Sequence, residues 1–341
     1  TAAPPRRLIP MRLTVYEAPR DHLSDLIREL SRFGRKIEVR DPLVLVPGDP
    51  PPAAWAQNAW TDARFIPISS IGDGAKKLRD IQRNWALTSV GHHRRARLIQ
   101  DKLPKIAAKN HVFGGPLPTA PLGAWTLWDE NRILASPSCS SPFPRGEWRF
   151  AEDKTGPPNR AYLKLWEILS RINERPGPGQ LCLDLGGSPG GWSYVLAGLG
   201  ARVFSIDKAP LDPAIEANPL VQYCQGSAFG LEPAAAGAVD WLFSDVICYP
   251  DRLYAMLLRW LRFGECRRFA CTVKLQGEAD HAMLDRLAAI PGSRLVHLFH
   301  NKHELTWINC DAPLGYRPPE GEAPDETGED AHAAGGQENH P

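Results

Sequence analysis

The sequence of 341 residues predicts an α/β protein: a mostly parallel, doubly wound sheet with an antiparallel hairpin at one edge, preceded by a smaller α+β domain. The length exceeds the ~100–200 residues of a typical domain, which favours two domains. In the second half, strand patterns alternate with helix patterns, as is typical of parallel sheets. The strand patterns are almost continuously apolar, as expected for strands covered by helices on both faces.

The first half has the mixed pattern of a small α+β domain. Asp21 is a typical helix N-cap, and the apolar residues at positions 23, 26, 27 and 30 keep helical spacing. The Pro-rich segment PGDPPPAAW interrupts the pattern. The expected elements are a strand, a helix and a strand within 11–46, a helical stretch over 74–109, and a hairpin over 123–137.

The second half begins with a helix pattern in RAYLKLWEILSRI, which ends at the break RPGPGQ. The last two strands are separated only by HNKH, which predicts the antiparallel edge hairpin. The elements expected after the break are strand 181–185, helix 191–199, strands 202–206, 220–224 and 239–244, helix 251–262, strand 268–274, helix 278–289, and strands 294–299 and 304–309.

A Pro-rich segment, SPSCSSPFPRGEW, separates the two patterns and places a domain boundary near residues 140–150. We therefore expect an N-terminal α+β domain over 1–140 and a second domain over 141–317. The remaining segment, 318–341, has seven acidic residues, no Lys or Arg, and almost no large apolar residue. Such a segment cannot bury enough apolar surface to fold, so we expect an acidic disordered tail.

The net charge of +1 hides a strongly basic segment over residues 76–109. This basic segment holds ten Lys or Arg and two acidic residues, a net charge of +8. It suggests a polyanionic partner such as RNA, although a basic helix face is often only solvated surface. Trp85 lies within it and is either a base-stacking residue or part of the core.

Composition also bounds the location of the protein. No apolar run is long enough to span a membrane, and no signal-peptide pattern is visible, so we expect no membrane association. The seven cysteines have no metal-type spacing, and the pair His92–His93 lacks a third ligand at a recognisable spacing, so we expect no metal site. An odd number of cysteines without a framework favours a reducing, cytoplasmic compartment.

A loop of small residues, DLGGSPGGW, follows the first strand of the second half. It lacks the G-x-G-x-x-G spacing of dinucleotide-binding folds, and Trp192 stands where a phosphate-binding P-loop needs Lys. Its glycines leave room for close approach of a ligand. Asp207 ends the next strand, where a carboxylate can accept both hydroxyls of a ribose. A ribose-binding acid without a phosphate grip favours S-adenosylmethionine; the alternative is a generic strand–loop–helix turn.

The longer segment DLGGSPGGWSYVL resembles the first motif of the FtsJ-like RNA ribose 2′-O-methyltransferases. Four other segments resemble the bacterial 23S rRNA cytidine 2′-O-methyltransferases of this family: SSPFPRGEWRFAEDKTGPPNRAYLKLWEIL, DWLFSDVICYPDRLYAMLLRWL, FACTVKLQ and HLFHNKHELTWI. The resemblance covers about residues 138–310. It implies a Rossmann-like class I methyltransferase fold, S-adenosylmethionine as cofactor, and RNA, with ribosomal RNA favoured, as substrate.

The family's Lys–Asp–Lys–Glu tetrad matches Lys164, Asp245, Lys274 and Glu304 (hereafter the tetrad). Strand C-ends of a doubly wound sheet line one crevice, so we expect these residues to converge. Lys274 is the expected general base, with its pKa lowered from ~10.4 toward neutrality by burial and a second ammonium. Lys164 would orient the ribose hydroxyl, Asp245 would bridge cofactor and lysines, and Glu304 would fix Lys274.

The expected cofactor site surrounds the glycine loop (residues 186–191). The family commonly has an acid near the adenine ring where this sequence has Ser227, which predicts a looser adenine grip. Trp192 is expected to pack under the loop rather than to stack on RNA. The expected cofactor-binding residues are Gly186, Ser188, Pro189, Gly190, Gly191, Trp192, Asp207, Ser227 and Asp245.

Three functions are compatible with these patterns. The favoured one is methyl transfer to a ribose 2′-hydroxyl of RNA. The second is a catalytically inactive RNA-binding homologue that keeps the fold as a scaffold; the intact tetrad argues against it, and Ser227 argues mildly for it. The third is a methyltransferase for a small molecule or protein, which the basic segment disfavours.

Overall fold

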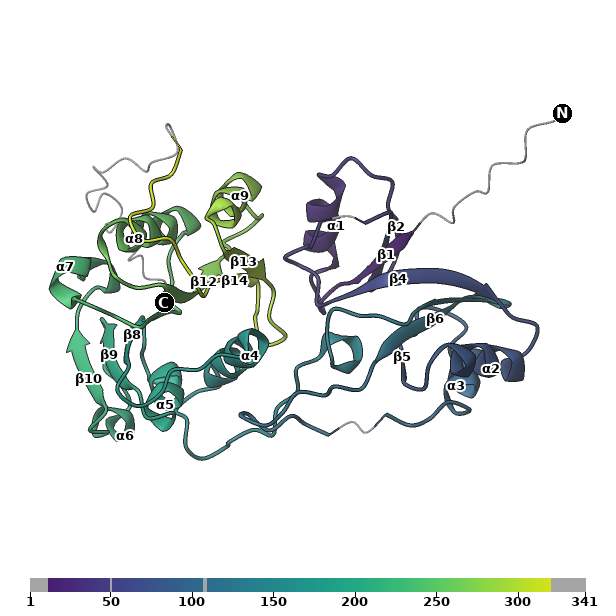
Figure 1. Cartoon of the computed structure of the whole chain (residues 1–341), viewed down its shortest axis with the longest axis horizontal. Coiled ribbons are helices and arrows are strands. Elements are labelled where there is room, and N and C mark those ends of the chain that lie inside the picture. Colours follow the sequence, from purple (N-terminus) through teal and green to yellow (C-terminus); the bar gives the residue numbers. More distant parts are fainter. Residues whose placement is uncertain (1–11, 50, 107–108, 320–341) are drawn as a thin grey trace, which may run out of the picture.

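The computed structural model describes residues 12–49, 51–106 and 109–319, which form two seven-stranded sheets (Figure 1). The predicted acidic tail falls almost entirely on residues 320–341, outside the described residues. No helix within the described ranges has the length and apolar character needed to cross a membrane.

The N-terminal sheet has the strand order β2-β3-β1-β4-β7-β6-β5. Its pairs are antiparallel except for β5 with β6. The strand–helix–strand pattern over 11–46 and the hairpin over 123–137 are confirmed, with the second strand split in two. The elements are β1 (Leu13–Glu17), α1 (Leu23–Ser31), β2 (Glu38–Arg40), β3 (Leu43–Pro47), β4 (Asn58–Pro67), α2 (Ile71–Ile81), β5 (Trp85–Leu87), α3 (His93–Gln100), β6 (Gly123–Asp129), β7 (Arg132–Ser136) and the 3₁₀ turn η1 (Pro144–Gly146).

Two strands of this sheet were not expected. The helical stretch over 74–109 is interrupted by β5, whose three residues are too short to show a period. The strand β4 has Asp62 and Arg64 at its centre, which weakens its strand pattern. Trp85, in β5, is fully buried, and its indole N–H donates to the Leu78 carbonyl at 2.9 Å. Trp85 is therefore a core residue and cannot stack on RNA.

The C-terminal sheet has the order β10-β9-β8-β11-β12-β14-β13. The pairs from β10 to β12 are parallel, and β14 runs antiparallel to both β12 and β13, which confirms the predicted edge hairpin. The elements are α4 (Tyr162–Ile172), β8 (Leu181–Leu185), α5 (Gly191–Gly198), β9 (Arg202–Asp207), α6 (Pro213–Glu216), β10 (Val221–Gln225), η2 (Ala228–Gly230), α7 (Pro233–Ala236), β11 (Trp241–Ser244), α8 (Pro250–Phe263), β12 (Arg268–Lys274), α9 (His281–Ala289), β13 (Ser293–Val296) and β14 (Glu304–Asn309).

Helices cover both faces of this sheet, as the apolar strands predicted. In Figure 1, α4 and α5 lie on one side and α8 and α9 on the other. Phe243 of β11 lies in the core of the first layer, and Leu242, its neighbour, lies in the core of the second. Adjacent strand residues point to opposite faces, so a strand buried on both sides needs an apolar residue at each position.

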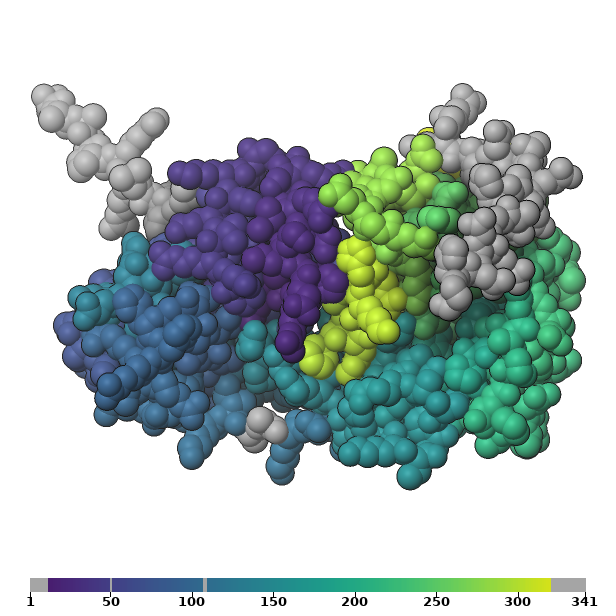
Figure 2. Space-filling view, turned by 180° about the vertical axis from the view of Figure 1, so that it is seen from behind, coloured from purple at the N-terminus to yellow at the C-terminus, as the bar shows by residue number. Residues whose placement is uncertain are grey.

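The two halves of the chain pack directly against each other. Leu26 and Leu30 of α1, with Trp55, share one apolar cluster with residues of α8, α9 and β14. The backbone N–H of His297 donates to the Ala54 carbonyl at 2.7 Å, and Arg32 pairs with Asp285. Figure 2 shows the purple N-terminal segment lying against the yellow-green one. The side of the N-terminal half that carries α1 is thus fixed next to β13 and β14.

Candidate active site

The tetrad residues form a closed ring of charge-assisted hydrogen bonds. The Lys164 Nζ lies 2.7 Å from Asp245 Oδ2 and 3.0 Å from Glu304 Oε1. The Lys274 Nζ lies 2.6 Å from Asp245 Oδ1 and 2.7 Å from Glu304 Oε2. Each carboxylate therefore bridges both ammonium groups, and each ammonium bridges both carboxylates. All four predicted residues are brought together, as the sequence predicted.

The sheet explains how residues so far apart in sequence meet. Lys274 is the last residue of β12, and Glu304, the first of β14, is its direct antiparallel partner. Asp245 follows β11, which pairs in parallel with β12, so it lies at the same edge. Lys164 comes from α4, where the buried Leu163 and Leu165 fix the helix on the sheet. Because β14 runs antiparallel to β12, its first residue lies at the edge of the sheet where the parallel strands end.

The tetrad is largely withdrawn from water and balanced in charge. The side chains of Lys164, Asp245, Lys274 and Glu304 are 12%, 16%, 18% and 7% exposed. Burial opposes ionisation of Asp245 and Glu304, but the two lysines outweigh it and lower the pKa of each carboxyl below its usual value. Removing one member of such a set leaves an uncompensated buried charge, which typically costs about 3–5 kcal/mol.

The expectation that the pKa of Lys274 is lowered toward neutrality is wrong for this arrangement. Burial does favour the neutral amine, as expected. The carboxylates of Asp245 and Glu304 nevertheless outweigh burial and raise the pKa of Lys274 above its usual value. Two anions at hydrogen-bond distance stabilise the ammonium more than the neighbouring Lys164 destabilises it. Lys274 is therefore protonated at neutral pH in the structure described.

Two adjoining cavities open beside the tetrad. The first, of about 290 Å³, is lined at one end by Asp207 and Ser227 and at the other by Asp245. The second, of about 200 Å³, is lined by Asp245, Lys274 and the glycine loop. Gly186, Ser188, Asp245 and Ile247 line both, so a ligand that fills them would run from Asp207 to the tetrad.

The glycines of the loop also serve the packing of the protein itself, in addition to lining the cavities at Gly186 and Gly191. A Cβ on Gly186 would lie 2.7 Å from the Val246 Cα, and one on Gly191 would lie 2.2 Å from the Asn159 Oδ1. Gly190 has a φ of 116°, and a Cβ there would lie 2.9 Å from the Ile215 Cγ2. At each of these positions the space for a side chain is already filled by protein atoms.

Other predicted cofactor residues face the cavities to different degrees. The Asp207 carboxylate accepts the backbone N–H groups of Ser188 and Ala209, each at 3.0 Å, and still lines the first cavity. The Ser188 hydroxyl donates to the Pro210 carbonyl. Of the predicted cofactor-binding residues, Pro189 and Gly190 line neither cavity. They shape the turn into α5 instead.

Trp192 is buried and lines the second cavity together with glycines of the loop. Its side chain is 2% exposed, its indole N–H donates to the Ala161 carbonyl at 2.9 Å, and its ring meets the edge of Phe243. This burial leaves no face for stacking on RNA.

Sequence reasoning missed three residues of the site. Arg252, in the first turn of α8, lies over the Phe229 ring at 4.1 Å, and both line the first cavity. Asp184, at the end of β8, lines the second cavity, and burial raises its pKa to about 7. The position of Asp184 near the C-terminal end of β8 could have identified it from the sequence. Arg252 lies within α8, well after the end of β11, and had no such signal. Phe229 follows an irregular segment and offered none.

Comparison with known proteins finds similarity in the C-terminal half of the chain. Residues 157–281 match the family model described as FtsJ-like methyltransferase. The chain is 36% identical over 158 residues to the ribosomal RNA large subunit methyltransferase M of Halorhodospira halophila, covering 44% of this chain and 46% of that protein. The protein of the same name from Laribacter hongkongensis is 29% identical over 197 residues, covering 52% and 55%.

The chain thus spans about half the length of the curated relatives it matches. Among solved structures, Aeropyrum pernix fibrillarin in complex with S-adenosyl-L-methionine gives a TM-score of 0.33 at 16% identity, covering 57% of this chain and 85% of that one. The segment that matches the FtsJ-like methyltransferase model, residues 157–281, contains three of the four tetrad residues and the glycine loop.

Proposed function

We propose that the protein transfers a methyl group from S-adenosylmethionine to a ribose 2′-hydroxyl of RNA, with ribosomal RNA as the substrate. The observation that carries the proposal is the ring of two lysines and two carboxylates at the end of a ligand-sized pair of cavities. A ribose hydroxyl is a very weak acid, so a methyltransferase for it needs a base and a means of holding the hydroxyl in line. The tetrad offers both.

The residues along the cavities fit S-adenosylmethionine. Each oxygen of the Asp207 carboxylate accepts only one backbone N–H, which leaves lone pairs for the two ribose hydroxyls. Phe229, with the Arg252 guanidinium over its ring, offers an apolar ring against which adenine can stack. Ser227 offers one hydrogen bond beside it. When bound, the cofactor supplies an electrophilic methyl group on a positively charged sulfur.

We assign the proton transfer to Lys274. Its Nζ borders the second cavity, and loss of its proton would leave a neutral amine held by Asp245 and Glu304. A positive charge brought into the cavity beside Asp245 opposes the ammonium and lowers the pKa of Lys274. Lys274 can therefore lose its proton and act as a base only when the positively charged cofactor is bound. Without the cofactor, proton transfer to Lys274 is limited.

The other three residues act through position. Lys164 shares both carboxylates with Lys274 and can donate a hydrogen bond to the ribose oxygen. Asp245 lines both cavities and links them to the two amines. Glu304 holds Lys274 in register through the β12–β14 pair. Fixing reacting groups in this way can supply up to roughly 7–11 kcal/mol of the barrier.

The N-terminal half, residues 1–140, is proposed to recruit the RNA, and residues 141–317 to carry out the transfer. Helices α2 and α3, which carry most of the basic segment, lie side by side at the end of the N-terminal sheet away from the methyltransferase half (Figure 1). A cytoplasmic location is proposed with this function, and all seven cysteines, which lie within the described residues, are free thiols.

The decisive test maps 2′-O-methyl groups in total RNA from cells with and without the gene. Loss of a ribosomal RNA mark that returns with the wild-type gene and not with Lys274→Met is the expected result. The purified protein should also bind S-adenosylmethionine in calorimetry. If every mark persists without the gene while the protein still binds RNA, the scaffold role replaces the enzymatic one.

A change to α3 tests RNA recruitment. Arg94 and Arg97 are exposed and three residues apart, so they lie on one helix face. We expect the double variant Arg94→Gln with Arg97→Gln to weaken RNA binding. The plot of the logarithm of the association constant against the logarithm of the salt concentration should become less steep by about 1.4, because each phosphate contact in single strands contributes about 0.7. Binding is measured by anisotropy at several salt concentrations.

The matched control is Arg20→Gln with Lys36→Gln, which removes the same charge from exposed positions outside the basic segment. An equal loss of affinity in both double variants would mean that net charge, and not this helix face, attracts the RNA.

A further inference from the structure

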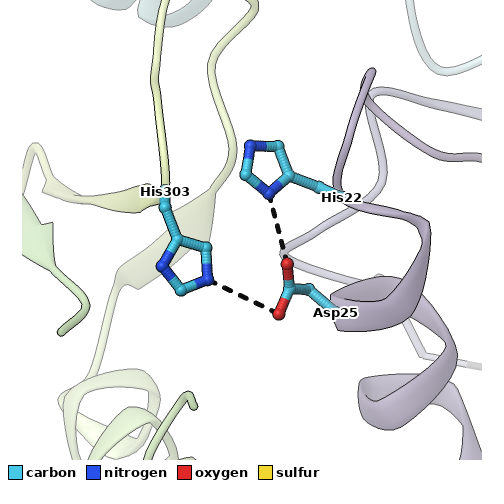
Figure 3. Close-up of side chains that lie close together, drawn as sticks. All are labelled: His22, Asp25 and His303. Carbon is cyan, nitrogen blue, oxygen red and sulfur yellow. Dashed lines mark hydrogen bonds and ion pairs between the residues drawn. The ribbon is translucent and has the colours of Figure 1, made fainter. Parts of the chain in front are cut away.

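Two histidines and an aspartate form a cluster where the two halves of the chain meet, outside the methyltransferase site. His22 and Asp25 flank the start of α1, and His303 directly precedes Glu304 of β14 (Figure 3). The ligand atoms of the three side chains all lie within 4.8 Å of one another. Within the described ranges this histidine cluster is the one group of three or more side chains with such spacing.

The spacing suits a tetrahedral metal ion. The His22 Nδ1 lies 3.2 Å from Asp25 Oδ2, and the His303 Nε2 lies 3.5 Å from Asp25 Oδ1. Zinc binds histidine nitrogen and carboxylate oxygen at about 2.0–2.2 Å, which places neighbouring tetrahedral ligands roughly 3.3–3.5 Å apart. Each histidine nitrogen therefore lies at about this separation from one oxygen of the carboxylate, and the ligand atoms of all three side chains lie within 4.8 Å of one another.

The hydrogen bonding of His303 leaves its other ring nitrogen in need of a cation. The His303 Nδ1 faces the Leu275 carbonyl at 3.3 Å, and a carbonyl can only accept, so the Nδ1 carries the proton. In the neutral ring, the Nε2 lone pair then points at the Asp25 carboxylate, which is repulsive. A proton or a metal ion between them removes the repulsion. A ring N–H donated to a backbone carbonyl is also the usual support of a metal-bound histidine.

The histidine cluster is largely withdrawn from solvent, apart from one open side. The side chains of His22 and Asp25 are 14% and 5% exposed, while that of His303 is 37% exposed and leaves one side open to solvent. The neighbouring His297 is 2% exposed, its ring lies 5.1 Å from that of His22, and its Nδ1 has no partner among the described residues. The His297 Nε2 faces the Lys302 carbonyl at 3.0 Å and so carries the proton, which makes the unpaired Nδ1 an acceptor.

We propose that the histidine cluster binds one divalent transition-metal ion of the zinc class, with His22, Asp25 and His303 as ligands and water in the fourth position. Imidazole nitrogen with one carboxylate is a donor set that zinc accepts. Arg28, which lies 3.4 Å from Asp25 Oδ1 and 2.8 Å from Glu278, remains as an outer partner of the carboxylate. The ion joins α1 to the strand that presents Glu304 and so clamps the two halves together.

The test uses the full-length protein after treatment with a chelator. Titration with zinc chloride in a calorimeter should give one ion per chain, and cobalt(II) should give the visible absorption of a tetrahedral site. Zinc should also raise the melting temperature. We expect His22→Asn to weaken zinc binding at least tenfold and to abolish the cobalt spectrum.

The control is His92→Asn, at an exposed histidine outside the cluster whose φ of 47° suits asparagine. It should bind zinc as the wild type does. The absence of stoichiometric binding to the wild type would overturn the proposal and leave a hydrogen-bonded histidine–aspartate pair only. Equal binding by wild type and His22→Asn would also overturn it. The cobalt spectrum of the wild type decides the matter if the His22 variant does not fold.

Discussion

Lys274→Met should reduce methyl transfer by roughly 10²–10⁴-fold, the range over which a general base contributes to catalysis. The change keeps an apolar stem of similar length but removes the amine that lies 2.6 Å from Asp245 and 2.7 Å from Glu304. We expect turnover to fall while S-adenosylmethionine still binds, because Asp207 and Ser227, at the far end of the first cavity, are untouched. Single-turnover transfer of a labelled methyl group measures the effect.

The pH dependence separates a base from a merely structural lysine. Asp245 and Glu304 raise the pKa of Lys274, so the neutral amine is scarce at neutral pH, and the wild-type rate should rise with pH until the amine is deprotonated. The raised pKa also stabilises the fold below the unfolded value of ~10.4, and this contribution is lost as the pH rises through the folded value. Lys274→Met should lack both dependences.

Lys36→Met, at an exposed position in the N-terminal half, is the matched control and should keep the wild-type rate and pH profile. A Lys274→Met protein that binds the cofactor and retains a tenth or more of the wild-type rate would exclude Lys274 as the base. Lys164 would then be the next residue to test.

Gly186→Ala should destabilise the methyltransferase half even without any ligand. The φ of 79° at this position costs a non-glycine residue about 1–3 kcal/mol, and the added Cβ would lie 2.7 Å from the Val246 Cα. Because the overlap is with backbone, it cannot be relieved by a side-chain rotation. We expect a lower midpoint of denaturant unfolding for the ligand-free protein, and a displaced Asp245, which is the residue after β11 and adjoins Val246.

Gly198→Ala is the comparison for this change, because a Cβ there meets no atom within 4 Å and φ is not positive. It should leave the unfolding midpoint unchanged or raise it slightly, since alanine has the higher helix propensity. If ligand-free Gly186→Ala were as stable as the wild type and only cofactor affinity fell, the glycine would serve the ligand and not the packing.

Most elements of the C-terminal half could be predicted because each is long enough to show its period. Strand 181–185 and strand 268–274 were placed at their observed limits. Elements of three residues, such as β5, show no period, and β4 carries charged residues that face solvent. The order of the N-terminal sheet could not be predicted, because β1 pairs with β3 and β4, and β4 pairs with β7, across long stretches of sequence that no local pattern relates.

The candidate site, too, could be predicted from the sequence only in part. Tetrad residues next to strand ends could be placed at one edge, since parallel strands end together. The ring of hydrogen bonds and the resulting rise in the pKa of Lys274 depend on distances that a sequence does not contain. The histidine cluster was missed because His22 and His303 come from different halves of the chain, and no spacing rule relates them.

The packing of α1 against the edge hairpin has a consequence for how a target is chosen. The backbone bond from His297 to Ala54 and the apolar contacts of Leu26 fix the N-terminal sheet beside the strand that begins with Glu304. Under the proposed recruitment of RNA by α3, the RNA would meet the tetrad at a fixed distance along the molecule. The proposal then implies that the methylated nucleotide is selected by its distance from the bound part of the RNA, and not only by its base.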